Sequence, residues 1–238
     1  MAGANLDRSV LKGLAPFARL ADPELANVTE RAVSRRLPAG ADAFGQGDPA
    51  ESFFVLVYGR LRVTQVTPAG EQIVVRMINP GDLFGIAKAL RLATYPGTAT
   101  AVVESVALSW PMSEWDEMVA LYPSFAASTI QTIGGRLQDA HTRILEMSTE
   151  AVERRLGHTV LRLAQQAGRA EQDGIRIDFP ISKQDLAEMT GTTLHTVSRV
   201  LTAWDSAGLV DSGRQKLLIK NPHRLLLIAD GIEPGLLT

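Results

Sequence analysis

The chain has 238 residues, a length that allows one large domain or two modest ones. Apolar residues make up 45% of it and charged residues 21%, which excludes a mostly disordered chain and allows a sizeable core. The 24 basic and 26 acidic residues leave a net charge of −2, so any nucleic-acid site must be local. The absence of cysteine excludes disulfides, zinc–thiolate sites, cysteine-held iron–sulfur clusters and cysteine nucleophiles.

The sequence contains no pattern typical of a membrane protein or of a metal-binding protein. No stretch reaches the roughly 18 consecutive apolar residues of a membrane span, and the first residues lack a signal-peptide pattern. We therefore expect a cytoplasmic protein that makes no membrane contact. The four histidines are His141, His158, His195 and His223. No two of them have the i, i+4 spacing of a chelating pair, so we expect no metal site.

Residues 35–110 carry the pattern of a β domain. Short runs rich in β-branched and aromatic residues alternate there with glycine, proline and aspartate. The strands that we expect cover residues 52–58, 61–66, 73–78 and 99–108. Short strands separated by turn residues are typical of a β-sandwich or a small barrel, so we predict a β domain over residues 1–122.

The period of the apolar residues then becomes helical. Residues 113–122 predict a short helix with Ser113 as its N-cap, and Pro123 begins a longer helix over residues 123–147. Apolar residues recur along the longer helix at alternating steps of three and four, at Ile130, Ile133, Leu137, Ala140, Ile144 and Met147. This row is typical of a parallel homodimer interface, and the alternative is a helix that packs on its own β domain.

The last region, residues 148–238, combines helical periods with turn residues and short strands. A helix that stops at Gly168 leads through a polar segment to a short strand, which Pro180 ends. Ser182 then begins a short helix with a capping-box pattern, and Gly191 breaks it. Two short helices joined by such a glycine turn predict a helix-turn-helix.

The second of these helices, capped by Thr192 or Thr193, has two distinct faces. Its apolar residues Val197, Val200, Leu201 and Trp204 fall on one side of the helical wheel, and His195, Ser198, Arg199 and Thr202 fall on the other. A polar face near the start of such a helix is suited to the major groove of double-stranded DNA.

A β-hairpin with Arg214 and Lys216 in its turn is expected to follow, as a DNA-binding wing. The fold class predicted for the whole chain is therefore α+β. The residues predicted to contact DNA are Ser182, Thr192, Thr193, His195, Ser198, Arg199, Arg214 and Lys216.

Several short motifs, in their order along nearly the whole chain, resemble those of a known protein family. The motifs are Gly40, Gly47-Asp48, Gly59, Gly70-Glu71, Pro80-Gly81-Asp82-Leu83-Phe84-Gly85, Glu153-Arg154-Arg155-Leu156 and the run of residues 193–199. In this order they resemble the Crp/Fnr family of bacterial transcription regulators. The resemblance implies a jelly-roll sensor similar to a cyclic-nucleotide-binding domain, a dimerisation helix, and a winged helix-turn-helix over residues 148–238. It also implies a homodimer that binds a palindromic operator and RNA polymerase, as an activator or a repressor, without enzymatic activity.

The resemblance also suggests an effector pocket. Its residues would be Gly81, Asp82, Leu83, Phe84, Gly85, Thr94, Tyr95, Thr98 and Thr100, beside the start of the dimerisation helix. Members that bind cyclic nucleotides carry an arginine for the phosphate in this part of the chain. Residues 93–100 contain none, and Arg91 is the nearest substitute, so we do not expect cyclic AMP to be the effector.

Without the phosphate-binding arginine and without cysteines, the chain resembles the nitrogen-oxide-responsive (NnrR-like) branch of the family. This resemblance predicts a response to nitric oxide or low oxygen. The chain lacks the cysteines of iron–sulfur members. Haem stays open as a cofactor, with Met77, Met112, Tyr58, Tyr95 or His141 as the available ligands. The alternatives are a cyclic-nucleotide-responsive regulator, a ligand-independent regulator and a cupin-like enzyme. The last would need histidines on the barrel strands, where the sequence has none.

The resemblance also indicates which residues contact the bases of the operator. The family pattern Glu-Thr, then Val or Ile, then Ser or Gly, then Arg stands here as His195-Thr196-Val197-Ser198-Arg199, so a histidine replaces the glutamate. Arg199 is then expected to contact a guanine edge, which its planar guanidinium fits. His195 is expected to change the preference at the base pair that it faces.

Overall fold

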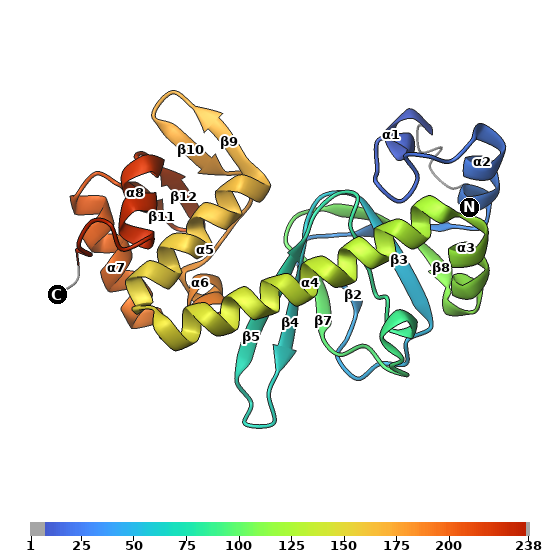
Figure 1. The fold of residues 1–238 in the computed structure, drawn as a ribbon, viewed down its shortest axis with the longest axis horizontal. Coiled ribbons are helices and arrows are strands. Elements are labelled where there is room, and N and C mark those ends of the chain that lie inside the picture. Colours follow the sequence, from blue (N-terminus) through green and yellow to red (C-terminus); the bar gives the residue numbers. More distant parts are fainter. Residues whose placement is uncertain (1–7, 237–238) are drawn as a thin grey trace. The chain divides into compact units, whose positions relative to one another are not determined.

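The computed structural model describes residues 8–236. These residues form two compact units, which meet between Gln138 and Asp139 inside the long helix α4 (Pro123–Thr149). The first half of α4 therefore belongs to the β-rich unit and the second half to the C-terminal unit, as the yellow-green helix in Figure 1 shows. The domain boundaries predicted from the sequence lie at the two ends of this helix, after residues 122 and 147.

The first unit contains two four-stranded antiparallel sheets, with strand orders β1-β8-β3-β6 and β2-β7-β4-β5. The strands are β1 (Val33–Leu37), β2 (Asp42–Phe44), β3 (Ser52–Tyr58), β4 (Leu61–Val66), β5 (Gln72–Ile78), β6 (Leu83–Phe84), β7 (Thr98–Ala101) and β8 (Ser105–Pro111). The predicted strands 52–58, 61–66 and 73–78 are confirmed to within a residue. Strands β1, β2 and β6 were not predicted, because they are short.

The prediction of one strand over residues 99–108 is wrong. The chain forms β7 and β8 there, one in each sheet, and residues 102–104 cross between them. At the crossing, the Ser105 hydroxyl accepts a hydrogen bond from the Arg60 backbone N–H at 3.0 Å. A Cβ on Gly59, whose φ is +90°, would lie 2.6 Å from the Glu104 carbonyl oxygen. The crossing depends on this tight backbone contact, which the β-branched composition of the segment does not reveal.

Two hydrophobic clusters hold the first unit together. One lies between the sheets, where Phe44 stacks on Tyr95 with 3.8 Å between ring centroids and Phe54 stacks on Phe84. The other covers the outer face of the β1-β8-β3-β6 sheet with helices α1 (Arg8–Lys12), α2 (Asp22–Glu30), α3 (Trp115–Leu121) and the start of α4. Strand β3 is therefore buried on both faces, which explains its continuous apolar run.

The helices of the first unit differ from the prediction in one detail. Ser113 is not an N-cap, because Met112–Glu114 form a 3₁₀ turn (η2) and α3 begins only at Trp115. A second 3₁₀ turn (η1) covers Lys88–Leu90. Helix α4 begins at Pro123 as predicted and continues to Thr149. Within residues 8–236, no helix is long and apolar enough to cross a membrane.

The second unit combines helices with one four-stranded antiparallel sheet of order β11-β12-β10-β9. Its elements are α5 (Val152–Ala167), β9 (Gly168–Glu171), β10 (Gly174–Ile177), α6 (Lys183–Thr190), α7 (Leu194–Ser206), β11 (Val210–Gly213), β12 (Lys216–Ile219) and α8 (Pro222–Ala229). The polar segment after Gly168, predicted as a connection, forms strand β9. All four of its residues are exposed, so it has no apolar alternation to reveal it. The predicted α+β class is confirmed.

Candidate nucleic-acid interface

Helices α6 and α7 form the predicted helix-turn-helix, and local capping sets both starts. The Ser182 hydroxyl accepts a hydrogen bond from the Asp185 backbone N–H at 3.0 Å, and the Asp185 carboxylate accepts one from the Ser182 N–H at 2.9 Å. Gly191 ends α6 in the left-handed conformation. Thr193, and not Thr192, caps α7 by accepting a hydrogen bond from the Thr196 N–H.

Helix α7 presents the two faces that the sequence predicts. Its buried face consists of Val197, Val200, Leu201 and Trp204, each at most 1% exposed. The Trp204 indole N–H donates a hydrogen bond to the buried Glu153 carboxylate at 2.8 Å, which ties α7 to α5. On the opposite face His195, Arg199 and Thr202 are exposed and Ser198 is half-buried. The polar groups near the start of α7 are therefore free of the protein core.

The predicted wing is the hairpin of β11 and β12. Arg214 and Gln215 form its turn, with Gln215 at a φ of +58°, and Lys216 is the first residue of β12 and not part of the turn. Both Arg214 and Lys216 are exposed. The two cations therefore stand at the tip of the hairpin, where a phosphate backbone could reach them.

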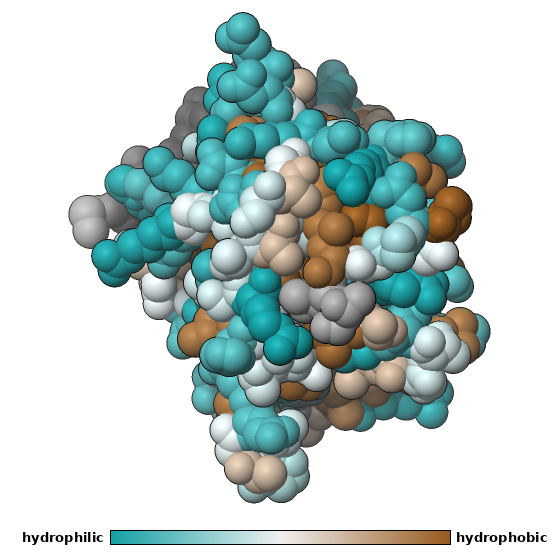
Figure 2. Space-filling model, turned by 90° about the vertical axis from the view of Figure 1, so that its left-hand side faces the viewer, coloured by the Kyte–Doolittle hydropathy of each residue, from teal (hydrophilic) through white to brown (hydrophobic). Residues whose placement is uncertain are grey.

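The wing and the start of α6 enclose an open pocket of about 470 Å³. It is lined by Ser182, Lys183, Ser212, Gly213, Arg214 and Gln215. Lys183 also donates a hydrogen bond to the Ser198 hydroxyl at 3.3 Å, so it links the pocket to the polar face of α7. Figure 2 views the molecule from the side of this unit and shows that hydrophilic side chains cover much of that face.

Lys183 is a candidate contact that the sequence analysis missed. It is the first residue of α6, where the helix dipole disfavours a cation. A lysine at that position would be stabilised by a nearby anion. The pocket thus carries two cationic side chains, Lys183 and Arg214, in its lining.

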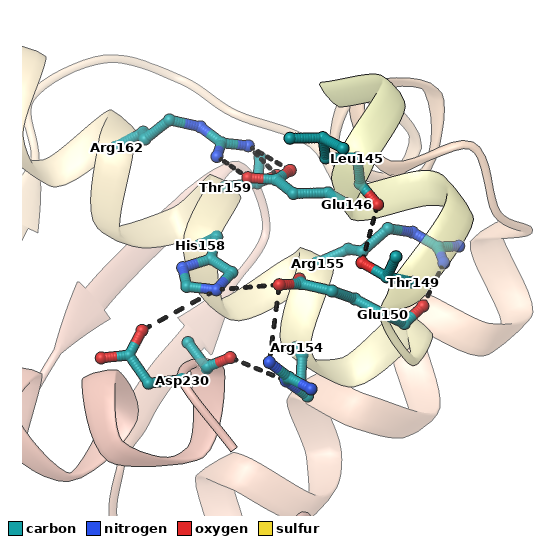
Figure 3. Close-up of polar contacts among 11 residues, drawn as sticks. Leu145, Glu146, Thr149, Glu150, Arg154, Arg155, His158, Thr159, Arg162 and Asp230 are labelled. Carbon is teal, nitrogen blue, oxygen red and sulfur yellow. Dashed lines mark hydrogen bonds and ion pairs between the residues drawn. The ribbon is translucent and has the colours of Figure 1, made fainter. Parts of the chain in front are cut away.

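A polar cluster joins the end of α4 to α5 (Figure 3). Arg162 forms a two-point ion pair with Glu146, and its Nη2 also donates to the Thr159 hydroxyl at 3.1 Å. The Glu150 carboxylate lies 3.5 Å from both the Arg154 guanidinium and His158 Nε2. The last turns of α4 are therefore anchored to α5 within the second unit. Within residues 8–236, no group of three or more His, Cys, Asp or Glu residues could hold a metal ion.

The residues of the suggested effector pocket are mostly engaged in structural contacts. Leu83, Phe84 and Tyr95 are at most 4% exposed and belong to the two hydrophobic clusters. The remaining members are Gly81 and Gly85 with positive φ, Asp82 bonded to the Asn79 N–H, Thr94 bridged to Pro49, Thr98 bonded to the Gln46 N–H and Thr100 bonded to Asp42. Burial raises the pKa of the Tyr95 hydroxyl, which donates to the Ser52 carbonyl.

The predicted dimer row divides between two environments. Ile130 and Leu137 are each 72% exposed, Ile144 63% and Met147 54%, and Ala140 is exposed as well. Ile133 is half-buried and packs against the core of the first unit. The alternative in which α4 packs on its own β domain therefore holds for the stripe that contains Ile133, and the homodimer interface stays a prediction.

Comparison with known proteins defines the class and then the family. A model of the cyclic nucleotide-binding domain matches residues 34–122, and a model of the Crp-like helix-turn-helix domain matches residues 154–228. A β-roll followed by a winged helix-turn-helix defines a DNA-binding regulator. The chain belongs to the Crp/Fnr family of transcription regulators, which also confirms the prediction that it is not an enzyme.

Individual relatives are distant but extend over most of the chain. The global nitrogen regulator of Synechocystis is 28% identical over 86% of this chain and 95% of its own length. The cyclic AMP receptor protein of Thermus thermophilus is 27% identical over 93% of this chain and 100% of its own. The structure of FixK2 from Bradyrhizobium japonicum matches with a TM-score of 0.70 at 22% identity, over 82% of this chain and 95% of that one. This last likeness concerns the fold.

Proposed function

We propose that the chain acts as a homodimer that binds a palindromic operator with half-sites about one helical turn of DNA apart. The observation that carries this proposal is the geometry of α7. Its polar face is exposed at the start of the helix, and the cations Lys183 and Arg214 flank it at the pocket between α6 and the wing. An α-helix placed in the major groove would direct such side chains at base edges, while the flanking cations contact phosphates.

The exposed stripe of α4 supports the homodimer. Ile130, Leu137 and Ile144 follow one another at steps of seven, so they form one continuous apolar row on the helix. Apolar surface gains about 25 cal/mol for each Å² removed from water, which favours covering this row. A second copy of α4 lying parallel to the first would cover it in register and would give the assembly the two-fold symmetry of a palindrome.

Arg199 and His195 are the proposed base-reading residues. The Arg199 guanidinium can donate two hydrogen bonds to guanine O6 and N7. His195 is exposed at the second position of α7 and can both donate and accept a hydrogen bond. We propose that Arg199 keeps the preference of the family for a guanine. We propose that His195 changes the preference at the neighbouring base pair.

Selection of bound sequences from random DNA tests this function, with wild type and His195→Glu compared side by side. We expect wild type to enrich a two-fold symmetric site, and His195→Glu to change one base pair in each half-site while it keeps the half-site spacing. Enrichment of asymmetric or single half-sites by the wild type would contradict the proposal. An unchanged consensus in the variant would remove His195 from it.

The signal is proposed to be nitric oxide or low oxygen, from the resemblance to the NnrR-like branch. The residues available as haem ligands do not fit that cofactor. The Tyr95 hydroxyl is committed to Ser52, Tyr58 is 66% exposed, His141 is exposed and Met112 packs against the hydrophobic core. Met77 is half-buried, as Met112 is. We therefore propose a response that does not depend on haem in the β domain.

An ultraviolet–visible spectrum tests the signal. Protein purified without oxygen is measured before and after addition of nitric oxide and haem, with operator affinity followed on the same samples. A colourless protein whose operator affinity changes with nitric oxide would support the proposal. A haem band that shifts with nitric oxide would overturn the haem-independent part, and constant affinity under all conditions would favour the ligand-independent alternative.

Contact with RNA polymerase completes the proposed function. We propose that the bound dimer acts on transcription through the polymerase, as an activator where the operator lies upstream of the promoter. Transcription in vitro from a template with the selected operator upstream measures this directly. An increase in transcript supports activation, and a decrease on the same template would make the chain a repressor.

A further inference from the structure

The hydroxyl groups along α7 are not all bonded in the same way. Thr202 Oγ1 donates a hydrogen bond to the Ser198 carbonyl at 2.8 Å, and Ser206 Oγ donates to the Thr202 carbonyl at 3.0 Å. Donation to the carbonyl four residues earlier is a common local bond of serine and threonine inside a helix. Ser198 departs from this pattern, because its hydroxyl oxygen accepts a hydrogen bond from Lys183 Nζ of α6 at 3.3 Å.

The chemistry of the two groups fixes the direction of this bond. An ammonium group has three hydrogens to donate and no lone pair, so Ser198 can only accept from Lys183. A serine hydroxyl has one hydrogen and two lone pairs, and the bond uses one lone pair. In the part of the chain that the structure describes, the Ser198 hydroxyl makes no second hydrogen bond. Its hydrogen is therefore available to a group outside the protein.

This hydrogen lies on the polar face of α7. Ser198 is the fifth residue of the helix, three residues after His195 and next to Arg199, the two residues proposed to read bases. Side chains on one face near the start of such a helix meet neighbouring base pairs when the helix lies in the major groove. The Ser198 hydroxyl would therefore meet a base edge as well.

The charge of Lys183 limits what the Ser198 hydroxyl can bind. An oxygen that accepts from a cation is polarised, so its own O–H becomes a stronger donor. The ammonium also repels the hydrogens of an approaching amino group and attracts the lone pairs of a carbonyl or a ring nitrogen. In the major groove, guanine and thymine present acceptors and no donor, whereas cytosine presents its N4 amino group. The arrangement therefore suits guanine or thymine and disfavours cytosine.

Lys183 differs in this respect from the other cation of the pocket. Lys183 and Arg214 both line the pocket between α6 and the wing, where a phosphate could reach them. The ammonium of Lys183 has hydrogens left for a phosphate after it bonds Ser198. Arg214 lies in the turn of the hairpin. The pocket therefore offers a matched pair of cations, of which Lys183 is the one bonded to the polar face of α7.

We propose that Lys183 is a positioning residue for base recognition, which makes the Ser198 hydroxyl a hydrogen-bond donor and so selects guanine or thymine at one base pair of each half-site. The inference rests on the proposed DNA binding and deepens it, because it assigns an effect on sequence preference to a side chain that touches no base. A lysine that contacted phosphate alone would strengthen binding to all sequences equally.

Selection from random DNA with the full-length protein tests the proposal, followed by affinity measurements on single-base variants of the selected operator. Wild type is compared with Ser198→Ala, Lys183→Met, Lys183→Arg and Arg214→Met. The base pair at which Ser198→Ala loses its preference identifies the position that Ser198 faces. We expect wild type to favour guanine or thymine over cytosine there by about fivefold, the worth of one hydrogen bond.

The lysine variants separate positioning from phosphate contact. We expect Lys183→Met to lose the preference at the same base pair, and Lys183→Arg to keep it, because arginine also carries only donors. Arg214→Met should weaken all sequences equally and keep the preference. A Lys183→Met protein that binds more weakly but retains the preference would overturn the proposal. Should Lys183→Met fail to fold, Lys183→Ala replaces it with the same expectations.

The double variant Ser198→Ala/Lys183→Met shows whether Lys183 acts through Ser198. We expect the lysine substitution to change no base preference once the hydroxyl is absent, and a further change of preference would overturn the proposal. A consensus that Ser198→Ala leaves unchanged would also overturn it. An operator selected by wild type then leaves the proposed function standing. A wild type that selects no operator would instead contradict the proposed function itself.

Discussion

Glu146 and Arg162 form a two-point ion pair between the last turns of α4 and the middle of α5 (Figure 3). The Glu146 side chain is 10% exposed, whereas that of Arg162 is 38% exposed, so one partner is buried and the other reaches solvent. The pair therefore anchors a helix that passes from the β-rich unit into the DNA-binding unit.

Replacing Glu146 by glutamine is expected to weaken this anchor. The buried carboxylate loses its charge while Arg162 keeps its own, and partial exposure of Arg162 limits the cost to about 1–2 kcal/mol of unfolding free energy. Urea denaturation of Glu146→Gln, Arg162→Gln and the double variant measures it. We expect a coupling energy of about 1 kcal/mol in this cycle, and additive effects would show that the pair contributes nothing.

The exposed row on α4 predicts the effect of Leu137→Glu. A charge at the centre of the apolar row should prevent dimerisation, leave the monomer folded and abolish operator binding, because one winged helix-turn-helix alone contacts half the site. Sedimentation and operator binding measure the two effects. Gln138→Glu is the matched control, since it adds the same charge next to the row. Tight operator binding by monomeric Leu137→Glu would contradict the dimer.

Arg199 and Arg214 are expected to respond differently to substitution. Arg199→Ala should cost about 1–3 kcal/mol at the selected operator and relax the preference for one base, because Arg199 is proposed to contact a guanine. Arg214→Ala should weaken all sequences equally and reduce the salt dependence of log K by about one, as loss of a phosphate contact does. Fluorescence anisotropy over a salt series measures both. Equal salt slopes for wild type and Arg214→Ala would remove the wing from the interface.

Tyr95 predicts a loss of stability in alkaline solution. Burial raises the pKa of its hydroxyl in the folded state, so the folded chain holds this proton more tightly than the unfolded chain. The associated stability is fully present below the ordinary tyrosine pKa of about 10 and is lost as the pH rises through the folded value. Urea denaturation from pH 8 to 11 should show a steeper loss for wild type than for Tyr95→Phe. Parallel curves would contradict this assignment.

The helix-turn-helix was the part of the fold that local pattern predicted best. The capping box of Ser182 and Asp185, the glycine turn and the two faces of α7 depend on residues close together in sequence, and the structure confirms each. Short edge strands such as β9 and the crossing between β7 and β8 were missed. These strands form because they pair with other strands of a sheet. Neither their composition nor the period of their apolar residues indicates which strand is the partner.

The sequence by itself determined the order of the β domain, the long helix and the DNA-binding helices, because turn residues, caps and apolar periods act over a few neighbouring residues. Only the tertiary structure decided which face of α4 is buried, since that depends on what packs against it. It placed Arg136 beside Arg76 and Lys183 beside Ser198, pairs that are 60 and 15 residues apart. Polar groups so distant in sequence meet only when the chain has folded, and burial and the neighbouring charges then act on them.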